Sequence, residues 1–534
     1  MEIITAMNLV KKNIHMNKAV KLVSTEFTLD DDFVVPDIKP DIDRIVSKKC
    51  NMHIDNVNIN SGRLTLRGAL DFNVLYGCLN DGFLESMRGS IVFEEPVNCS
   101  EISMEEQMLF SEAGNEWGIR VNCTVENIHI GIINTRKISV KAVVLIEVIN
   151  EELNDLEVIE EVTGNEDIAI LTNRKKVAQA AVRKKDIFRI KDEIDIPGNK
   201  ANIGEIIWDD TRIGEINFRV LNGEVALSGE LKIFMLYRPM EEGVPVQWLD
   251  GTIPFSGNIQ VDNCTEDMIH DIKSELTQVV TEVRNDFDGE QRIIAIDGVL
   301  DFNMLLYKEE EIEYISDVYC CGRELIPQYK ECVLNKIIIK NSSKAKIQGK
   351  MSTENTGINI LQVCNCSGVC SIENLEHTEN GIKINGMITS NIIYISDDDR
   401  YPFAGSIGRI PFEHTIDIPG INKNTKYFIT PESVGLSAIM TGASEIEIKG
   451  TVTFECMAID EEMENIMTDV KDNPLDMEKL LKMPGMVGYM VKEGDTLWNI
   501  ARDFYTTMDS IKEINGLKGD KLNPGEMLLL VKKI

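Results

Sequence analysis

A repeated, glycine-centred stretch constrains the fold of this chain more than any other feature. Three copies span residues 62–76, 223–237 and 381–394, and in each a tyrosine follows the central glycine by eight residues. In the first copy apolar side chains recur at every second position, which is the period of a strand with one buried face. Such a repeat predicts that most of the chain is an array of one β-rich module. The glycine–tyrosine pairs are Gly68 with Tyr76, Gly229 with Tyr237, and Gly386 with Tyr394.

The repeat extends beyond this strand. A proline-led segment that begins at Pro36 and includes Lys39 returns at Pro197 with Lys200, and the third copy lacks it. A second glycine-centred strand also ends each copy, over residues 137–146, 292–302 and 444–454, with Ala142 replacing the glycine in the first. Glycine inside a strand marks a bulge or a bend. We therefore predict a mainly β fold of tandem antiparallel β-sandwich-like modules.

The domain organisation follows from these repeats. The first module is expected to begin with an N-terminal helix, and a short basic helix is expected at residues 174–185. The acidic, Met-rich composition of residues 459–484 predicts a linker. The predicted domains are module 1 at 1–160, module 2 at 165–325, a divergent module 3 at 330–458, the acidic linker at 459–484 and a small βααβ domain at 485–534.

Composition excludes several classes of function. The net charge of −33 argues against nucleic-acid binding, which needs a basic surface, and against purely electrostatic docking on anionic lipid. No apolar run is long enough to span a membrane, and the first residues lack the pattern of a secretory signal, so we expect a cytoplasmic protein. The twelve cysteines are then expected to be thiols, with a metal site or later oxidative cross-linking as alternatives.

The sequence carries no pattern typical of catalysis. A phosphate-binding loop and a nucleophile elbow are absent, and none of the six histidines belongs to a paired metal motif. We therefore expect no catalytic residue, no cofactor and no metal, although a site assembled only in three dimensions remains an alternative.

The last fifty residues resemble a LysM domain. The matching residues are Tyr489, Val491, Gly494 to Leu497, Ile500, Ala501, Asn515, Leu522, Pro524, Gly525 and Leu528. In that family a shallow groove between two turns binds N-acetylglucosamine polymers. The resemblance implies a groove lined by Gly494, Asp495, Thr496, Leu497, Ile514, Asn515, Asn523 and Pro524.

Two residues of the first helix in this domain have competing interpretations. Leu497 shares a helical stripe with Ile500 and Ala501, which favours a core position over a groove position. Trp498 is one position off that stripe, and we predict that it points outward and contacts a partner, because exposing a tryptophan gains nothing otherwise.

The order of the domains narrows the family. Modules with Val-Pro-Asp-Ile-Lys-Pro at residues 35–40 and the glycine–tyrosine strand resemble SPOCS repeats of spore-forming bacteria, and SPOCS repeats followed by LysM resemble the SipL family of spore-coat morphogenesis proteins. The resemblance implies a mother-cell protein at the forespore surface, which binds a SpoIVA-like coat ATPase through LysM and contacts other coat proteins. We thus expect a non-enzymatic adaptor. The alternative is a protein that binds peptidoglycan or a chitin-like glycan through the LysM groove.

Overall fold

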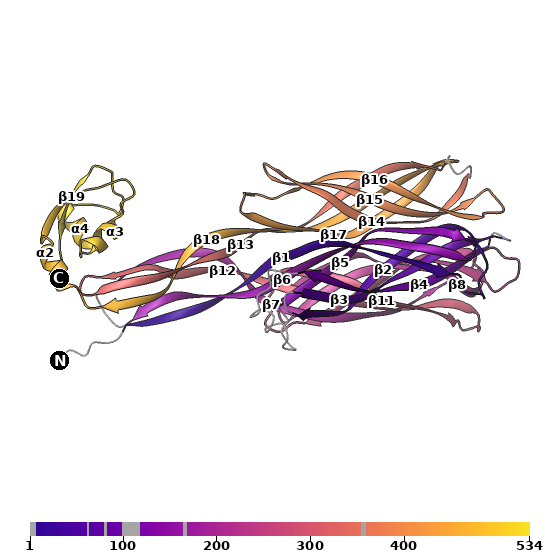
Figure 1. The fold of residues 1–534 in the computed structure, drawn as a ribbon, viewed down its shortest axis with the longest axis horizontal. Coiled ribbons are helices and arrows are strands. Elements are labelled where there is room, and N and C mark those ends of the chain that lie inside the picture. Colours follow the sequence, from indigo (N-terminus) through magenta and orange to yellow (C-terminus); the bar gives the residue numbers. More distant parts are fainter. Residues whose placement is uncertain are drawn as a thin grey trace.

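The protein is an elongated molecule built almost entirely of antiparallel strands (Figure 1). The computed structural model describes residues 7–60, 63–79, 83–98, 118–163, 168–353 and 359–533. A broad β body is joined by a narrower stalk of long strands to a small unit with helices at the opposite end. The predicted fold class, mainly β with a small C-terminal βααβ domain, is confirmed.

The β region contains eighteen described strands, six in each module. Module 1 comprises β1 (Asn8–Val34), β2 (Ile42–Asn60), β3 (Arg63–Cys78), β4 (Leu84–Asn98), β5 (Gly118–Asn134) and β6 (Lys137–Thr163). Module 2 comprises β7 (Ile168–Asp195), β8 (Ile203–Leu221), β9 (Glu224–Pro239), β10 (Gln247–Gln260), β11 (Ile269–Asn285) and β12 (Gln291–Cys320). Module 3 comprises β13 (Glu324–Ser352), β14 (Ile360–Thr378), β15 (Gly381–Ser396), β16 (Phe403–Asp417), β17 (Thr425–Gly442) and β18 (Glu445–Asn473).

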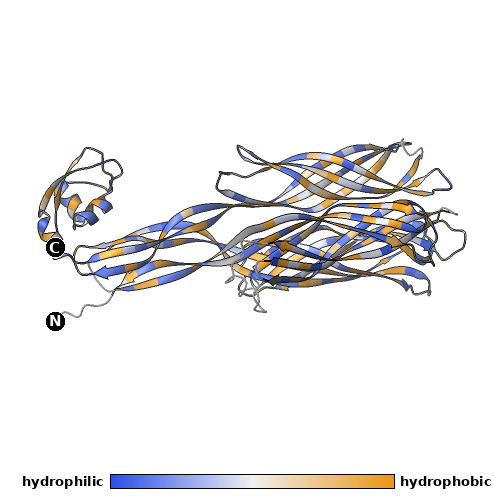
Figure 2. Cartoon of the chain, in the orientation of Figure 1, coloured by the Kyte–Doolittle hydropathy of each residue, from blue (hydrophilic) through white to orange (hydrophobic). Residues whose placement is uncertain are grey.

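Every module is a sandwich of two three-stranded antiparallel sheets with the same topology. The sixth strand lies between the first and the fifth, and the third lies between the second and the fourth. Apolar side chains of the two sheets pack into one core per module. Figure 2 shows hydrophobic and hydrophilic residues alternating along the strands, as expected for sheets with one buried face.

The glycine-centred repeats are the central strands β3, β9 and β15. Each central glycine is the register partner of a phenylalanine on the next strand: Gly68 of Phe93, Gly229 of Phe255, and Gly386 of Phe412. The strand on the other side has a bulge opposite each glycine. A Cβ atom on Gly386 would lie 2.6 Å from both the Ser371 carbonyl oxygen and the Phe412 ring. The glycines thus lie beside bulges, as predicted, but each bulge is in the neighbouring strand and not in the strand of the glycine.

The proline-led segment is held by an arginine and the repeated tyrosine. Arg136 donates to the carbonyl oxygens of Val35 (2.9 Å) and Lys39 (2.7 Å), and the Tyr76 hydroxyl donates to that of Pro40 (3.3 Å). Module 2 repeats the arrangement with Arg292, whose guanidinium donates to Pro197 and Lys200, and with Tyr237. In module 3, which lacks the proline-led segment, the position of the arginine is taken by Ser444.

The three modules are gathered around one pseudo-threefold axis instead of lying in a row. The residue before each repeated tyrosine, Leu75, Leu236 or Ile393, is buried in one cluster shared by all three modules. A bulge in the second strand of each module adds Val46, Ile207 and Cys364 to this cluster. Because equivalent residues meet at the axis, the array is closed on itself.

The stalk consists of the outer parts of the hairpins β1–β6, β7–β12 and β13–β18. Equivalent residues of the three hairpins form buried layers, one of Val158, Tyr314 and Ile466, and another of Val162, Val318 and Val470. The hairpins also share a bulge at Glu160, Ser316 and Thr468. We call each hairpin extension an arm, and the three arms pack against one another to form the stalk.

Three local predictions were wrong in the stalk. The expected N-terminal helix is strand β1, the expected helix at 174–185 lies within β7, and much of the expected linker at 459–484 is strand β18, which continues to Asn473. The reason is that each arm buries only a narrow line of side chains against two other arms. Charged residues fill the remaining positions, so the period-two pattern is weak in sequence.

Candidate functional site

The C-terminal unit folds as β19 (Met486–Met490), α3 (Leu497–Asp503), α4 (Met508–Asn515) and β20 (Met527–Val531), preceded by the short helix α2 (Met477–Lys482). Strands β19 and β20 pair antiparallel. Thr496 caps α3 by accepting a hydrogen bond from the Asn499 amide (3.1 Å), and Gly516 ends α4 in the left-handed conformation. The predicted order of strand, helix, helix and strand is confirmed.

Two turns of this unit lie side by side, as the predicted groove requires. The Val491 amide donates to the Glu526 carbonyl (2.9 Å), and the Gly525 amide donates to the Val491 carbonyl (2.8 Å). Gly494 and Gly525 have φ of 88° and 89°, in the left-handed region that favours glycine. The turns at 491–497 and 522–526 are therefore held together by backbone bonds.

Some of the predicted groove residues are exposed, and the others are buried or hydrogen-bonded within the domain. Those exposed on the two turns and at the end of α4 are Gly494, Thr496, Ile514, Asn523 and Pro524. Leu497, by contrast, is buried in the core, as its helical stripe indicated.

Asp495 and Asn515, two other residues of the predicted groove, make hydrogen bonds within the domain. The Asp495 carboxylate accepts from the Lys492 amide (2.7 Å) and the Tyr489 hydroxyl (2.8 Å), and these bonds lower its pKa. The Asn515 side chain exchanges hydrogen bonds with the backbone of Leu529, at 2.7 and 2.9 Å. Both polar groups are therefore used to fix the turns and the adjoining strand.

The prediction that Trp498 points outward is wrong. Its side chain is only 7% exposed, because the tip of the stalk covers it. The indole Nε1 donates to Asp317 Oδ2 at 2.8 Å, and the indole ring meets the Tyr319 ring edge to face at 4.8 Å. Arg502, one helical turn further on, donates to the same Asp317 oxygen at 2.7 Å. Trp498 is a contact residue, but its contact is with the arm of module 2.

Sequence reasoning missed Asp317, Tyr319 and Arg502. Asp317 and Tyr319 lie far from the C-terminal unit in sequence and have no motif of their own. The one available signal was the spacing of Trp498 and Arg502, which places both on one face of α3 outside the core stripe.

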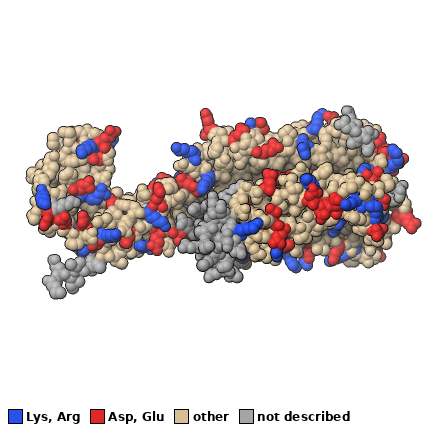
Figure 3. All heavy atoms as spheres, in the orientation of Figure 1, with Lys and Arg blue, Asp and Glu red and all other residues tan. Residues whose placement is uncertain are grey.

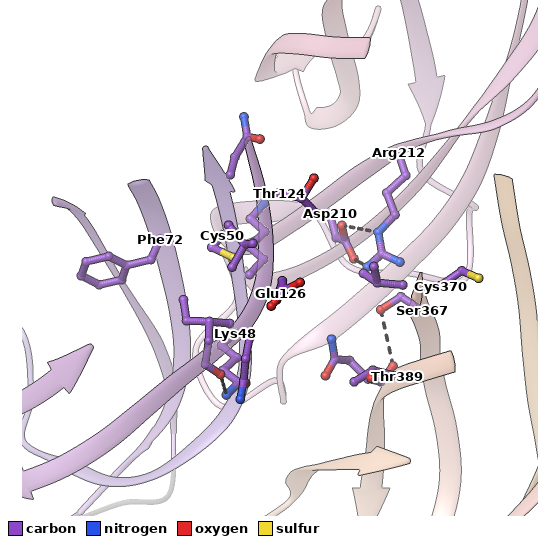
Figure 4. Close-up of a pocket in the computed structure, with 18 of the residues that line it drawn as sticks. Lys48, Cys50, Phe72, Thr124, Glu126, Asp210, Arg212, Ser367, Cys370 and Thr389 are labelled. Carbon is purple, nitrogen blue, oxygen red and sulfur yellow. Dashed lines mark hydrogen bonds and ion pairs between the residues drawn. The ribbon is translucent and has the colours of Figure 1, made fainter. Parts of the chain in front are cut away.

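A large hollow between the three modules is the other candidate site (Figure 4). It has a volume of about 2070 Å³ and is lined by side chains from all three modules, among them Glu126, Arg212 and Cys370. The side-chain amide of Asn73, a lining residue only 4% exposed, makes no hydrogen bond in the described part of the chain. The hollow has polar side chains among its lining residues and is roomy enough to hold ordered water at this amide.

Charged groups around the hollow pair with one another. The Asp209 carboxylate forms ion pairs with Arg88 (2.7 Å) and Lys49 (3.3 Å). The Arg212 Nε donates a hydrogen bond to Asp210 (2.9 Å). Opposite charges in contact neutralise each other, so these groups do not converge on one reacting atom. These paired groups therefore do not form a set of an acid, a base and a nucleophile.

The cysteines show no reactive arrangement in the residues that the structure describes. Cys364, Cys366 and Cys370 are free thiols, and burial raises the pKa of each to about 12. A thiol with so high a pKa is a poor nucleophile at neutral pH. Within the described ranges, no group of three or more histidine, cysteine, aspartate or glutamate side chains could hold a metal ion.

Comparison with known proteins agrees with this architecture. The family model described as "SipL, SPOCS domain" matches residues 41–133, 202–284 and 359–441, and the LysM domain model matches residues 489–530. The probable peptidoglycan endopeptidase LytE of Bacillus subtilis (strain 168) is 45% identical over 42 residues, which are 8% of this chain and 13% of LytE. No solved structure matches the chain.

These matches define a binding protein that carries three SPOCS repeats and one LysM domain, both non-catalytic types of domain. This is the domain set of the SipL-like proteins, and it supports a protein related to spore-coat formation with the potential to bind peptidoglycan. None of the helices in the described ranges has the length and apolar character needed to cross a membrane.

Proposed function

We propose that this protein is a non-enzymatic adaptor of the spore coat. In this proposal its LysM domain binds a SpoIVA-like coat ATPase and helps to anchor the coat around the forespore, on the mother-cell side. The observation that carries the proposal is the position of the LysM domain, which is held at one end of a stalk with its two turns exposed. A binding domain at the end of a long β body suits a protein that connects two structures.

An exposed apolar surface on the LysM domain favours a protein partner. Met490 and Met527 are cross-strand neighbours on the outer face of the β19–β20 sheet, and their exposed fractions are 57% and 64%. Leu529 and Met486 continue this face, which we call the methionine face. Exposed apolar patches mark interaction sites, and methionine adapts its shape to protein surfaces.

The charge of the body is consistent with a role as scaffold. Acidic side chains, with basic ones among them, are spread over the visible face of the β body, and no broad basic region is seen there (Figure 3). The net charge of −33 favours solubility and contacts with basic surfaces of other coat proteins.

The experiment is a binding assay with two ligands, the purified coat ATPase and insoluble peptidoglycan. The wild-type chain should bind the ATPase, and Met527→Glu should weaken this binding at least tenfold, since a charge would enter an apolar contact. The matched control is Met240→Glu, at a methionine of similar exposure on the body. Retention on peptidoglycan without binding to the ATPase would reject the adaptor proposal.

Peptidoglycan binding is the second candidate function. The similarity to LytE is confined to the LysM region, and the exposed groove residues Gly494, Thr496, Ile514, Asn523 and Pro524 support this candidate. The same assay decides between the two: binding to peptidoglycan that is lost in Asn523→Ala but kept in Met527→Glu would favour the glycan.

A further inference from the structure

The first helix of the LysM domain presents a second contact surface that the chain itself covers. Trp498 and Arg502 lie one turn apart on α3, beside the stripe of core residues Leu497, Ile500 and Ala501. We call these two residues the α3 face. Tryptophan and arginine are the residue types most enriched among the energetically dominant residues of protein interfaces.

The surface that covers the α3 face is a socket around Asp317 and Tyr319 on the arm of module 2. Asp317 is 7% exposed, and its Oδ1 accepts from the Val318 amide (2.9 Å) and the Tyr329 hydroxyl (3.2 Å). Its Oδ2 receives the two donors of the α3 face, Trp498 Nε1 and Arg502 Nη1. Tyr319 adds the aromatic contact. The stalk thus orients this carboxylate by two bonds that do not depend on the LysM domain.

Only one of the three pseudo-equivalent arms carries this socket. The positions equivalent to Asp317 are Glu161 and Asp469, which are both exposed, and the Tyr319 position holds Thr163 and Lys471. Asp469 makes the same local bond as Asp317, from the Val470 amide at 2.8 Å. Since the arms otherwise share their register and bulge, the buried carboxylate and tyrosine are particular to the arm on which LysM sits.

We propose that this socket is an autoinhibitory latch. It holds the LysM domain against the stalk and covers the α3 face until a competing partner takes the place of the socket. The partner surface that fits the α3 face has the chemistry of the socket, a carboxylate beside an aromatic ring. The inference rests on the proposed function in one respect, that the partner is the coat ATPase. The residues that connect the arm to α2 form a short tether, so release frees the LysM domain without separating it from the stalk.

The first test measures docking without any partner. In full-length protein with 15N-labelled tryptophan, the Trp498 indole N–H should exchange with solvent at least tenfold faster in Asp317→Ala than in wild type, since it loses a buried acceptor. Asp317→Asn should lie between the two, because it keeps the shape but loses the charge. Asp469→Ala is the matched control and should exchange like wild type. Small-angle scattering should show a broader range of dimensions for Asp317→Ala alone.

The second test measures affinity for the coat ATPase with the same variants. Asp317→Ala should bind several-fold more tightly than wild type, and Asp469→Ala should bind equally. If wild type binds the ATPase, release of the domain without tighter binding in Asp317→Ala would overturn the latch. Slow indole exchange in Asp317→Ala would overturn it in every case. If neither wild type nor Asp317→Ala binds the ATPase, the proposed function fails. The indole exchange rates then test the latch by themselves. Fast exchange in Asp317→Ala, which indicates a released domain, would support the latch, and slow exchange, which indicates a docked domain, would overturn it.

Discussion

Arg136 and Arg292 show how one side chain can hold a whole loop. Each guanidinium donates to carbonyl oxygens on both sides of the Pro-x-x-Lys turn, so the loop needs no core of its own. A planar fork of five donors can reach several acceptors in this way, whereas an ammonium group cannot do so with the same geometry. The arginine therefore explains why the proline-led segment and the last strand of a module recur together.

We expect Arg292→Ala to destabilise module 2 by about 2 kcal/mol, the usual scale for losing hydrogen bonds from a charged donor. Arg292→Lys should restore little of this loss, because lysine cannot bridge the same carbonyl groups. The measurement is denaturant unfolding of the full chain, with the exposed Arg284→Ala as control. Full rescue by lysine would contradict the role given to the guanidinium fork.

At the scale of the strand, the repeated glycine is explained by what surrounds it. A phenylalanine from one neighbour lies over the glycine, and a bulged strand on the other side brings its carbonyl oxygen close, 2.2 Å from a Cβ placed on Gly68 and 2.6 Å from one placed on Gly386. Bulges bend strands and increase their twist, which helps two small sheets to wrap around one core. Glycine is required here by close packing, not by an unusual φ.

Gly386→Ala should therefore destabilise module 3 by about 2 kcal/mol or more, because the new methyl group overpacks the strand. Gly298→Ala is the matched control, since a Cβ there meets no atom closer than 3.6 Å. This control should be neutral or slightly stabilising, as alanine loses less conformational entropy than glycine on folding. Equal destabilisation of both variants in chemical denaturation would contradict the packing argument.

The strands that the sequence predicts well are those with a full core behind them. In β3, β9 and β15 the period-two pattern and the repeated glycine both follow from local packing, so the fold class could be derived from residues alone. The strands of the arms could not be predicted from their own residues, because their buried side chains pack against arms of other modules. The LysM pattern predicts groove residues, five of which are exposed in the structure, and their use as a binding site stays a prediction. The socket at Asp317 depends on a contact between distant elements, which no local pattern indicates.

On the scale of the whole molecule, the contact between modules 2 and 3 contains a cluster of charged groups. Glu432 lies in β17 near Glu455, which pairs with Lys340 at 2.6 Å, and Glu215 of module 2 pairs with Lys344 at 2.7 Å. Burial, and then the neighbouring Glu455, raise the pKa of the Glu432 carboxyl to about 7. The folded chain therefore keeps a proton that the unfolded chain has released at mildly acidic pH.

This raised pKa predicts that stability falls as pH increases. The contribution of Glu432 is fully present below its unfolded pKa and is lost as pH rises through about 7. The denaturation midpoint of wild type should thus decrease between about pH 5 and about pH 8, and that of Glu432→Gln should decrease less. The exposed Glu242→Gln is the control and should follow wild type. An identical pH profile for Glu432→Gln and wild type would refute the assignment.

The meeting of all three arms in one stalk has a consequence for the evolution of this chain. In solenoid proteins each repeat touches only its neighbours, so copies can be gained or lost at little cost. Here buried layers of the stalk take one side chain from each module, as Val158, Tyr314 and Ile466 do in one layer and Val162, Val318 and Val470 in another. A chain with two modules would leave these layers without one of their three side chains, and a fourth module would have no position in them. The stalk therefore fixes the number of modules at three.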